Sequence, residues 1–199
     1  MGRFASWLAV TTLGAMGCSG AATIGDIFMA LDDAGVRRRT NFFTDTLSIY
    51  CVAEYGSGDN AVTLTGAIRQ RQLYNPATDQ MENTNRVLSL TETVPGKGPT
   101  RRVGVAFTKR NEAGQETVGN ELPNPAGKFE CEISLDGKLF SKLPFGVSFA
   151  PCPDGQITQR AGCRGFFKPN AVCPKYGSSS TDGATCTCDA TNGNWACQE

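Results

Sequence analysis

Nine cysteines in a chain of 199 residues constrain the possible folds more than any other feature of this sequence. Six of them lie in the last 48 residues, a segment that also has many glycines and few aliphatic side chains. A segment of this composition cannot bury an ordinary hydrophobic core, so cross-links must hold it together. Because disulfides persist in oxidising compartments, the cysteine content predicts an exported protein.

The N-terminus has the pattern of an export signal. Met1-Gly-Arg3 gives a short positive start, Phe4–Leu13 is an apolar run, and small residues precede Cys18. The run is too short to span a bilayer as a stable helix. This segment resembles the signal peptide of bacterial lipoproteins, and the resemblance implies that Cys18 becomes the lipidated N-terminus. Ala15 stands where that family prefers leucine, and ordinary signal-peptidase cleavage, giving a secreted protein, is the alternative.

The cysteines that follow Cys18 are even in number, as a disulfide framework requires. Cys51 and Cys131 both lie on inward faces of predicted strands, so we predict a bridge between them. Pairing of either one with a C-terminal cysteine is the alternative. Cys186 and Cys188 are too close to bond each other comfortably, so each pairs elsewhere. The predicted disulfide cysteines are Cys51, Cys131, Cys152, Cys163, Cys173, Cys186, Cys188 and Cys197.

Composition argues against several functions. The chain has no histidine, which excludes Ser-His-Asp and Cys-His pairs and every histidine-ligated metal site. Zinc held by cysteines alone is disfavoured in an exported chain. A redox pair at Cys186 and Cys188 is disfavoured because no basic neighbour activates either thiol. A formal net charge of zero argues against binding nucleic acid. We therefore predict no catalytic residue, no metal and no cofactor.

The segment 26–150 has the pattern of an all-β domain. Short runs with period two alternate with Gly, Pro, Asn and Asp, and about seven strands without an amphipathic helix predict a β-sandwich. The best strand is Lys128–Leu135, which ends at the hairpin signal Asp136-Gly137. The stretch Pro125–Lys138, with Phe145-Gly-Val147, resembles the last hairpin of immunoglobulin-like domains in bacterial envelope proteins. The chain lacks the tryptophan and the tyrosine corner of antibody-type domains.

These patterns divide the chain into four parts. Residues 1–17 form the predicted signal peptide, 18–25 a tether, 26–150 the immunoglobulin-like β-sandwich and 151–199 a disulfide-rich, loop-dominated module. The module's ending, from Cys186 through Trp195 to Cys197, is similar to the endings of small extracellular cysteine modules.

Large rings in the cysteine-rich module are the candidate ligand-binding residues. Exposed rings stack on sugars or anchor protein partners, although the same rings could form the only core of this module. The four candidates are Trp195, Tyr176, Phe166 and Phe167.

Three weaker polar patterns have simpler interpretations. Asp189, Asn192 and Asn194 could supply oxygen ligands to calcium, but their spacing favours a plain turn, as does that of Asp32, Asp33 and Asp45. The positive runs Arg37–Arg39 and Arg101-Arg102 are interpreted as solvated strand ends. Glu54, Glu130 and Glu132 could in principle support glycoside hydrolysis, but Glu130 and Glu132 fall on the outward face of a predicted hairpin.

The sequence favours a non-enzymatic component of the cell envelope. Its predicted partners are the membrane, through the lipid on Cys18, and an unidentified envelope protein or polysaccharide. Ser19 follows the cysteine, and the lipoprotein resemblance then implies the outer membrane. The alternative is a secreted carbohydrate-binding protein that uses the aromatic residues of the C-terminal module.

Overall fold

The structure, a computed structural model, describes residues 22–56, 62–93, 101–107, 109–110, 116–117, 123–159, 161–177 and 183–198. The predicted signal peptide and lipidation site Cys18 lie outside these residues. The described chain is mainly β, and no helix in it is long and apolar enough to cross a membrane. The first strand begins at Thr23, within the segment 18–25 that is predicted to be a tether.

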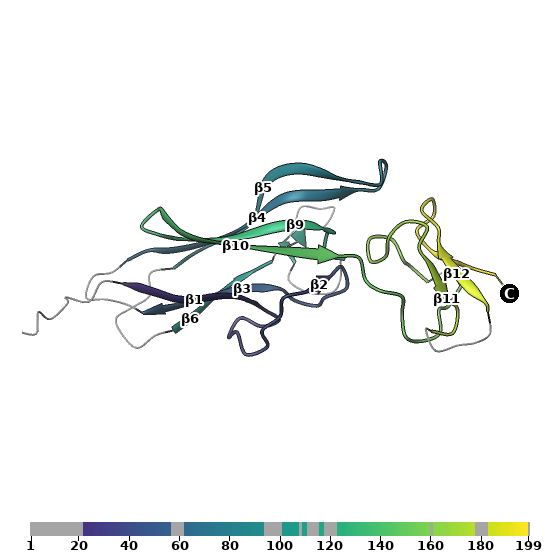
Figure 1. Cartoon of the computed structure of the whole chain (residues 1–199), viewed down its shortest axis with the longest axis horizontal. Coiled ribbons are helices and arrows are strands. Elements are labelled where there is room, and N and C mark those ends of the chain that lie inside the picture. Colours follow the sequence, from purple (N-terminus) through teal and green to yellow (C-terminus); the bar gives the residue numbers. More distant parts are fainter. Residues whose placement is uncertain are drawn as a thin grey trace, which may run out of the picture.

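Two sheets make up the N-terminal β domain (Figure 1). One contains three strands in the order β1-β3-β6, and the other contains five in the order β2-β10-β9-β4-β5. Their bounds are β1 Thr23–Ala30, β2 Phe42–Phe43, β3 Tyr50–Gly56, β4 Leu64–Asn75, β5 Gln80–Thr93, β6 Arg101–Ala106, β9 Gly127–Leu135 and β10 Lys138–Ser148. A separate short pair joins β7 Lys109–Arg110 to β8 Glu116–Thr117.

The core of this domain lies between the two sheets. The inward residues of β9 are Phe129, Cys131 and Ile133, as the period-two pattern predicts, and each is at most 1% exposed. Phe129 stacks on Phe145 of β10 with ring centroids 5.4 Å apart. Burying such rings removes large apolar areas from water and is the main favourable term in folding.

A disulfide between Cys51 of β3 and Cys131 of β9 joins the two sheets, with 6.2 Å between their Cα atoms. Both sulfurs are buried in the core. The predicted bridge is therefore confirmed.

The predicted hairpin at Asp136-Gly137 is also confirmed. Both residues have positive φ, 46° and 75°, which is the backbone of a type I′ turn. Pro144 lies in β10, and the described strand on its outer side, β2, pairs with Val147 and Ser148 alone. Pro144 therefore lies on a part of β10 that pairs only with β9 among the described strands, and a sheet edge of this kind tolerates a residue without an N–H.

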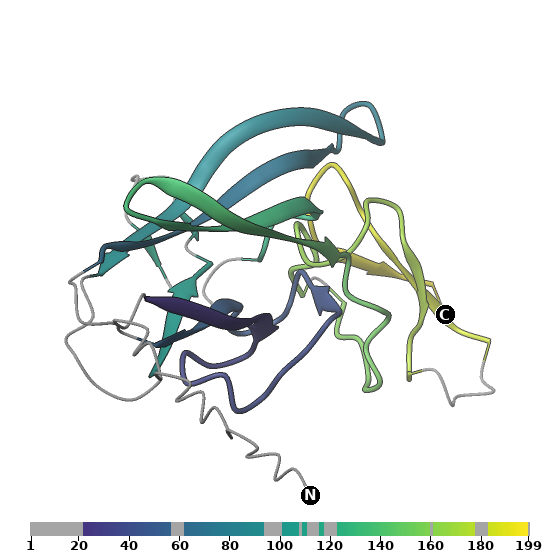
Figure 2. The ribbon, with the colours of Figure 1, turned by 60° about the vertical axis from the view of Figure 1, so that its left-hand side comes forward.

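β4 and β5 form a long hairpin. The alternation over Val62–Ile68 marks the start of β4, but the strand continues to Asn75 and returns from Gln80. The outer half of the hairpin carries mostly polar side chains and extends beyond the core. Figure 2 shows this hairpin curving over towards the C-terminal module.

The C-terminal module contains a small sheet of β11 Val172–Pro174, β12 Thr185–Cys188 and β13 Trp195–Cys197. Three disulfides close it: Cys152–Cys173, Cys163–Cys188 and Cys186–Cys197. Together with the bridge in the β domain they pair all eight predicted cysteines, which confirms the disulfide framework. Half-cystines make up most of the module's buried cluster, alongside Ile157 and Trp195. Four disulfides are typical of an exported, non-cytoplasmic protein.

Removing the bridge between the sheets should cost the β domain much of its stability. The bridge spans 80 residues, and the chain-entropy model assigns a loop of that size about 4 kcal/mol. We expect Cys51→Ala/Cys131→Ala to lower the free energy of unfolding by about this amount in urea titrations. The matched control is Cys152→Ala/Cys173→Ala, whose 21-residue loop lies in the module and should leave the β-domain transition in place. An unchanged urea midpoint for the first variant would contradict this account.

Candidate binding cleft between the β domain and the module

The four predicted ring residues do not form one exposed surface. Trp195 is only 4% exposed, and its ring packs on Phe167 with centroids 5.0 Å apart. Of the two interpretations left open for Trp195, a binding surface or the core of the module, the structure shows the core, because a module with so few apolar residues buries this ring. Phe166 is half-buried, and Tyr176 alone is well exposed, at 40%.

A buried polar network joins the module to the β domain. The carbonyl of Phe166 accepts hydrogen bonds from the Thr44 hydroxyl and from the Ala150 N–H. Thr44 is 1% exposed, and its backbone carbonyl accepts the Asn124 N–H at 2.7 Å. The Asn124 side chain in turn donates to the carbonyls of Phe43 and Thr46. Breaking a satisfied buried network is costly, so this network fixes the module against the domain.

A second contact joins the tip of the β4–β5 hairpin to the module. The Tyr74 hydroxyl donates to Asp79 at 2.7 Å, and the Lys168 ammonium lies 3.0 Å from the same carboxylate. Burial, and then the hydrogen bond to Asp79, raise the pKa of Tyr74 to about 12. Hydrogen bonds from Tyr74 and Lys168 hold the pKa of Asp79 below its usual value. We call Tyr74, Asp79 and Lys168 the hairpin latch.

Between these two contacts lies a cleft of about 650 Å³. Its walls come from the end of β4, from the segment 123–126, from Phe149 and from two loops of the module. The Tyr74 ring meets Phe149 edge-on at 4.8 Å. The lining is mainly apolar and rich in proline: Leu73, Tyr74, Pro76, Ala77, Pro123, Pro125, Ala126, Phe149, Phe167, Pro169 and Ala190. Clefts of this size and character at domain boundaries are common ligand sites.

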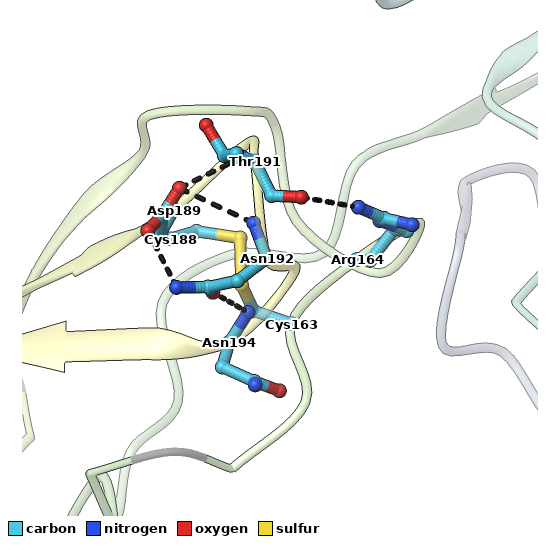
Figure 3. Close-up of a disulfide and its surroundings, with 7 residues drawn as sticks. All are labelled: Cys163, Arg164, Cys188, Asp189, Thr191, Asn192 and Asn194. Atoms are coloured by element: carbon cyan, nitrogen blue, oxygen red, sulfur yellow. Dashed lines mark hydrogen bonds between the residues drawn. A yellow bond between two sulfur atoms is a disulfide. The ribbon is translucent and has the colours of Figure 1, made fainter.

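The polar side chains that border the cleft bond to the protein itself. Arg164 donates to the Thr191 carbonyl at 2.9 Å, and the Asp189 carboxylate accepts the N–H of Thr191 and the side-chain amide of Asn192 (Figure 3). Asn192 accepts the Asn194 N–H. The side-chain oxygens of Asp189 and Asn192 therefore stabilise a turn, as the spacing predicts. The described residues contain no group of three or more His, Cys, Asp or Glu suited to a metal.

Several arginines of the two positive runs form ion pairs with nearby carboxylates. Arg37 pairs with Asp32, and Arg38 pairs with Asp26 and Glu54. Arg102 lies 3.1 Å from Glu54. The Arg38 guanidinium also covers the Phe28 ring, 3.7 Å from its centroid. These paired, exposed charges are consistent with the predicted solvated strand ends. The side chain of Arg101 lies outside the described part of the chain.

The two outward carboxylates of β9 belong to a charged ladder rather than to a pocket. Glu132 contacts Arg69 at 3.0 Å and Lys142 at 3.3 Å. Glu130 contacts Arg71 at 2.6 Å. Burial raises the pKa of Glu132, but hydrogen bonds from Arg69 and Lys142 outweigh burial and hold this pKa below its usual value. Glu132 thus stays ionised at neutral pH, and both carboxylates form cross-strand pairs on the outer sheet face.

Comparison with known proteins identifies no family. No protein-family model matches the chain, and no curated protein matches it. Among solved structures the chain is similar to the β-glucosidase DesR from Streptomyces venezuelae in complex with D-glucose, with TM-score 0.36 and 12% identity over 64% of this chain and 15% of that one. A β-glucosidase from Listeria innocua in complex with gluconolactone gives TM-score 0.35 and 6% identity over 64% and 16% of the two chains.

The β-D-glucoside glucohydrolase from Trichoderma reesei gives TM-score 0.34 and 6% identity over 65% of this chain and 19% of that one. The chain thus spans less than a fifth of each of these enzymes. Likenesses this weak carry no argument about activity.

Removing the charge of Asp79 should lower the pKa of Tyr74. In the unaltered protein that pKa is about 12, and the negative charge and hydrogen bond of Asp79 contribute to it. We expect Asp79→Asn to shift the Tyr74 titration to lower pH while burial keeps it above the ordinary value. Ring-labelled tyrosine NMR, with Tyr74→Phe for assignment, would measure this shift. Lys168→Met serves as the control, since loss of a cation should not lower the pKa of Tyr74. An unchanged titration in Asp79→Asn would rule out the latch.

The charged ladder should make stability depend on acid. The pKa of Glu132 is lower in the folded state than its ordinary value of 4.5. Its contribution is therefore present above about pH 4.5 and is lost as the pH falls through the lowered folded-state pKa. We expect Glu132→Gln to have a lower free energy of unfolding than the unaltered protein at pH 7. In acid the two free energies should become equal. The exposed Glu92→Gln is the control. If the difference in free energy of unfolding between Glu132→Gln and the unaltered protein is the same at every pH, the lowered pKa of Glu132 is contradicted.

Proposed function

We propose that this chain is a non-enzymatic binding protein of the cell envelope, lipid-anchored through Cys18, whose cleft between the β domain and the module holds an apolar segment of another envelope protein. The lipoprotein-like start, the disulfides and the cleft support this proposal.

We further propose that the β domain is an immunoglobulin-like β-sandwich. Its sheet orders, β1-β3-β6 and β10-β9-β4-β5, match the strand orders A-B-E and G-F-C-C′ of that fold. Cys51 and Cys131 then occupy strands B and F, where antibody domains carry their inter-sheet disulfide. Such domains commonly serve as rigid supports for binding surfaces at one end. The cleft would be such a surface.

The apolar lining of the cleft is the main support for the proposed binding function. Prolines and aromatic rings line it, and the prolines offer no N–H to a ligand. The bordering polar groups Arg164, Asp189 and Tyr74 bond within the protein. A sugar needs convergent donors and acceptors for its hydroxyls, whereas an apolar peptide segment needs only shape and apolar area. This chemistry favours a peptide over a polysaccharide, although the exposed Tyr176 keeps the carbohydrate alternative open to test.

Site-specific photocrosslinking in the native host tests this function. A benzoylphenylalanine at Ala77 or Ala190, on opposite walls of the cleft, should give the same crosslinked product. The matched control is Val36, which is 76% exposed and lies outside the cleft lining. Adding Leu73→Arg at the cleft wall should abolish the product, because a desolvated charge opposes an apolar ligand.

The outcomes separate the proposals. A protease-sensitive product from both cleft positions, lost with Leu73→Arg, supports peptide binding. A product sensitive to glycosidases would select the carbohydrate alternative. Equal crosslinking from Ala77, Ala190 and Val36 would refute the cleft as a binding site.

A further inference from the structure

The tip of the β9–β10 hairpin exposes two large apolar side chains side by side. Leu139 is 48% exposed and Phe140 is 54% exposed. Only Lys138 separates this pair from the two-residue turn at Asp136-Gly137. Single exposed apolar residues are ordinary on protein surfaces, but an adjacent pair at a protruding turn makes an apolar tip.

A β-bulge produces this exposure. The register of β10 against β9 shifts between Leu139 and Ser141, so Phe140 has no residue opposite it. Bulges commonly re-aim a side chain away from the sheet. The carboxylate of the turn residue Asp136 faces back, accepting the Thr63 N–H at 2.8 Å, while Lys138 is exposed. The tip therefore presents apolar side chains beside a lysine, with its acidic group turned inward.

The tip lies at the end of the β domain where β1 begins. Thr23 pairs with Gly56, the last residue of β3, and Leu64 at the start of β4 pairs with Leu135 beside the turn. Figure 1 shows the start of β1 and the β9–β10 turn at one end, with the module at the other. Five residue steps separate Thr23 from Cys18, a reach of at most about 17 Å. A lipid on Cys18 would hold this end close to the bilayer.

We propose that Leu139 and Phe140 insert into the interfacial layer of the same phospholipid bilayer that holds the lipid on Cys18, an inference that rests on the proposed anchor. Apolar side chains enter the boundary of headgroups and acyl chains to a depth of about 5–10 Å. Lys138 beside them suits lipid phosphates, since lysine buries its stem and keeps its ammonium in the headgroups. Two contacts, one covalent and one from the hairpin, orient the domain with its cleft directed away from the membrane.

Tryptophan fluorescence in proteoliposomes tests the insertion. The lipidated mature protein, with its lipid verified by mass, carries Phe140→Trp or, as a second reporter, Leu139→Trp. Val172→Trp is the control, because Val172 is 60% exposed and lies in the module at the opposite end. Trp195 gives the same buried background in every variant. We expect a blue shift and loss of fluorescence in brominated phospholipid at positions 139 and 140 but not at 172.

The outcomes distinguish this inference from the anchor itself. Lipid on Cys18 without quenching at 139 or 140 would overturn the insertion and leave the anchor standing. A blue shift without quenching would place the tip against protein and would also overturn it. Absence of lipid on Cys18 would remove both the anchor and the inference that rests on it.

Discussion

Disulfides hold both parts of this protein in shape, and they matter most in the C-terminal module. The module has too few apolar side chains for a conventional core, and its buried cluster consists largely of the half-cystines themselves. Three bridges fix its loops, and the loops carry the polar turn at Asp189 that forms one wall of the cleft. In the β domain one bridge adds to a core that already joins the sheets. Reduction should therefore affect the module more severely than the β domain.

Contacts between the β domain and the C-terminal module hold the cleft between them in a defined shape. Thr44, Asn124 and Phe166 form a buried network at the base, and the hairpin latch of Tyr74, Asp79 and Lys168 connects the units on the other side. The network is sheltered from water, whereas the latch is exposed and depends on charge. Exposed ion pairs contribute little to stability. The latch would thus set the position of the hairpin rather than the stability of the fold.

Sequence patterns predicted the parts of this molecule that local chemistry controls. Alternation placed Phe129, Cys131 and Ile133 inward, Asp136-Gly137 marked a turn, and even cysteine counts indicated full pairing. The cleft was missed because its residues come from distant segments, such as Tyr74 at the end of β4 and Phe149 after β10, whose rings meet edge-on. No local pattern marks such a contact. Trp195 was ambiguous for a related reason, since a ring in a segment without aliphatic neighbours fits either a surface or a core.

We propose an exported protein with four disulfides that is tethered through lipid at one end and offers a cleft at the other. Intact mass of the mature protein from membranes, with and without reductant, tests it most directly. We expect loss of residues 1–17, a diacyl or triacyl addition on Cys18 and a gain of about 8 Da on reduction, about 2 Da for each bridge. A soluble product without lipid would contradict the tether, and a smaller gain on reduction would contradict the bridges that hold the cleft.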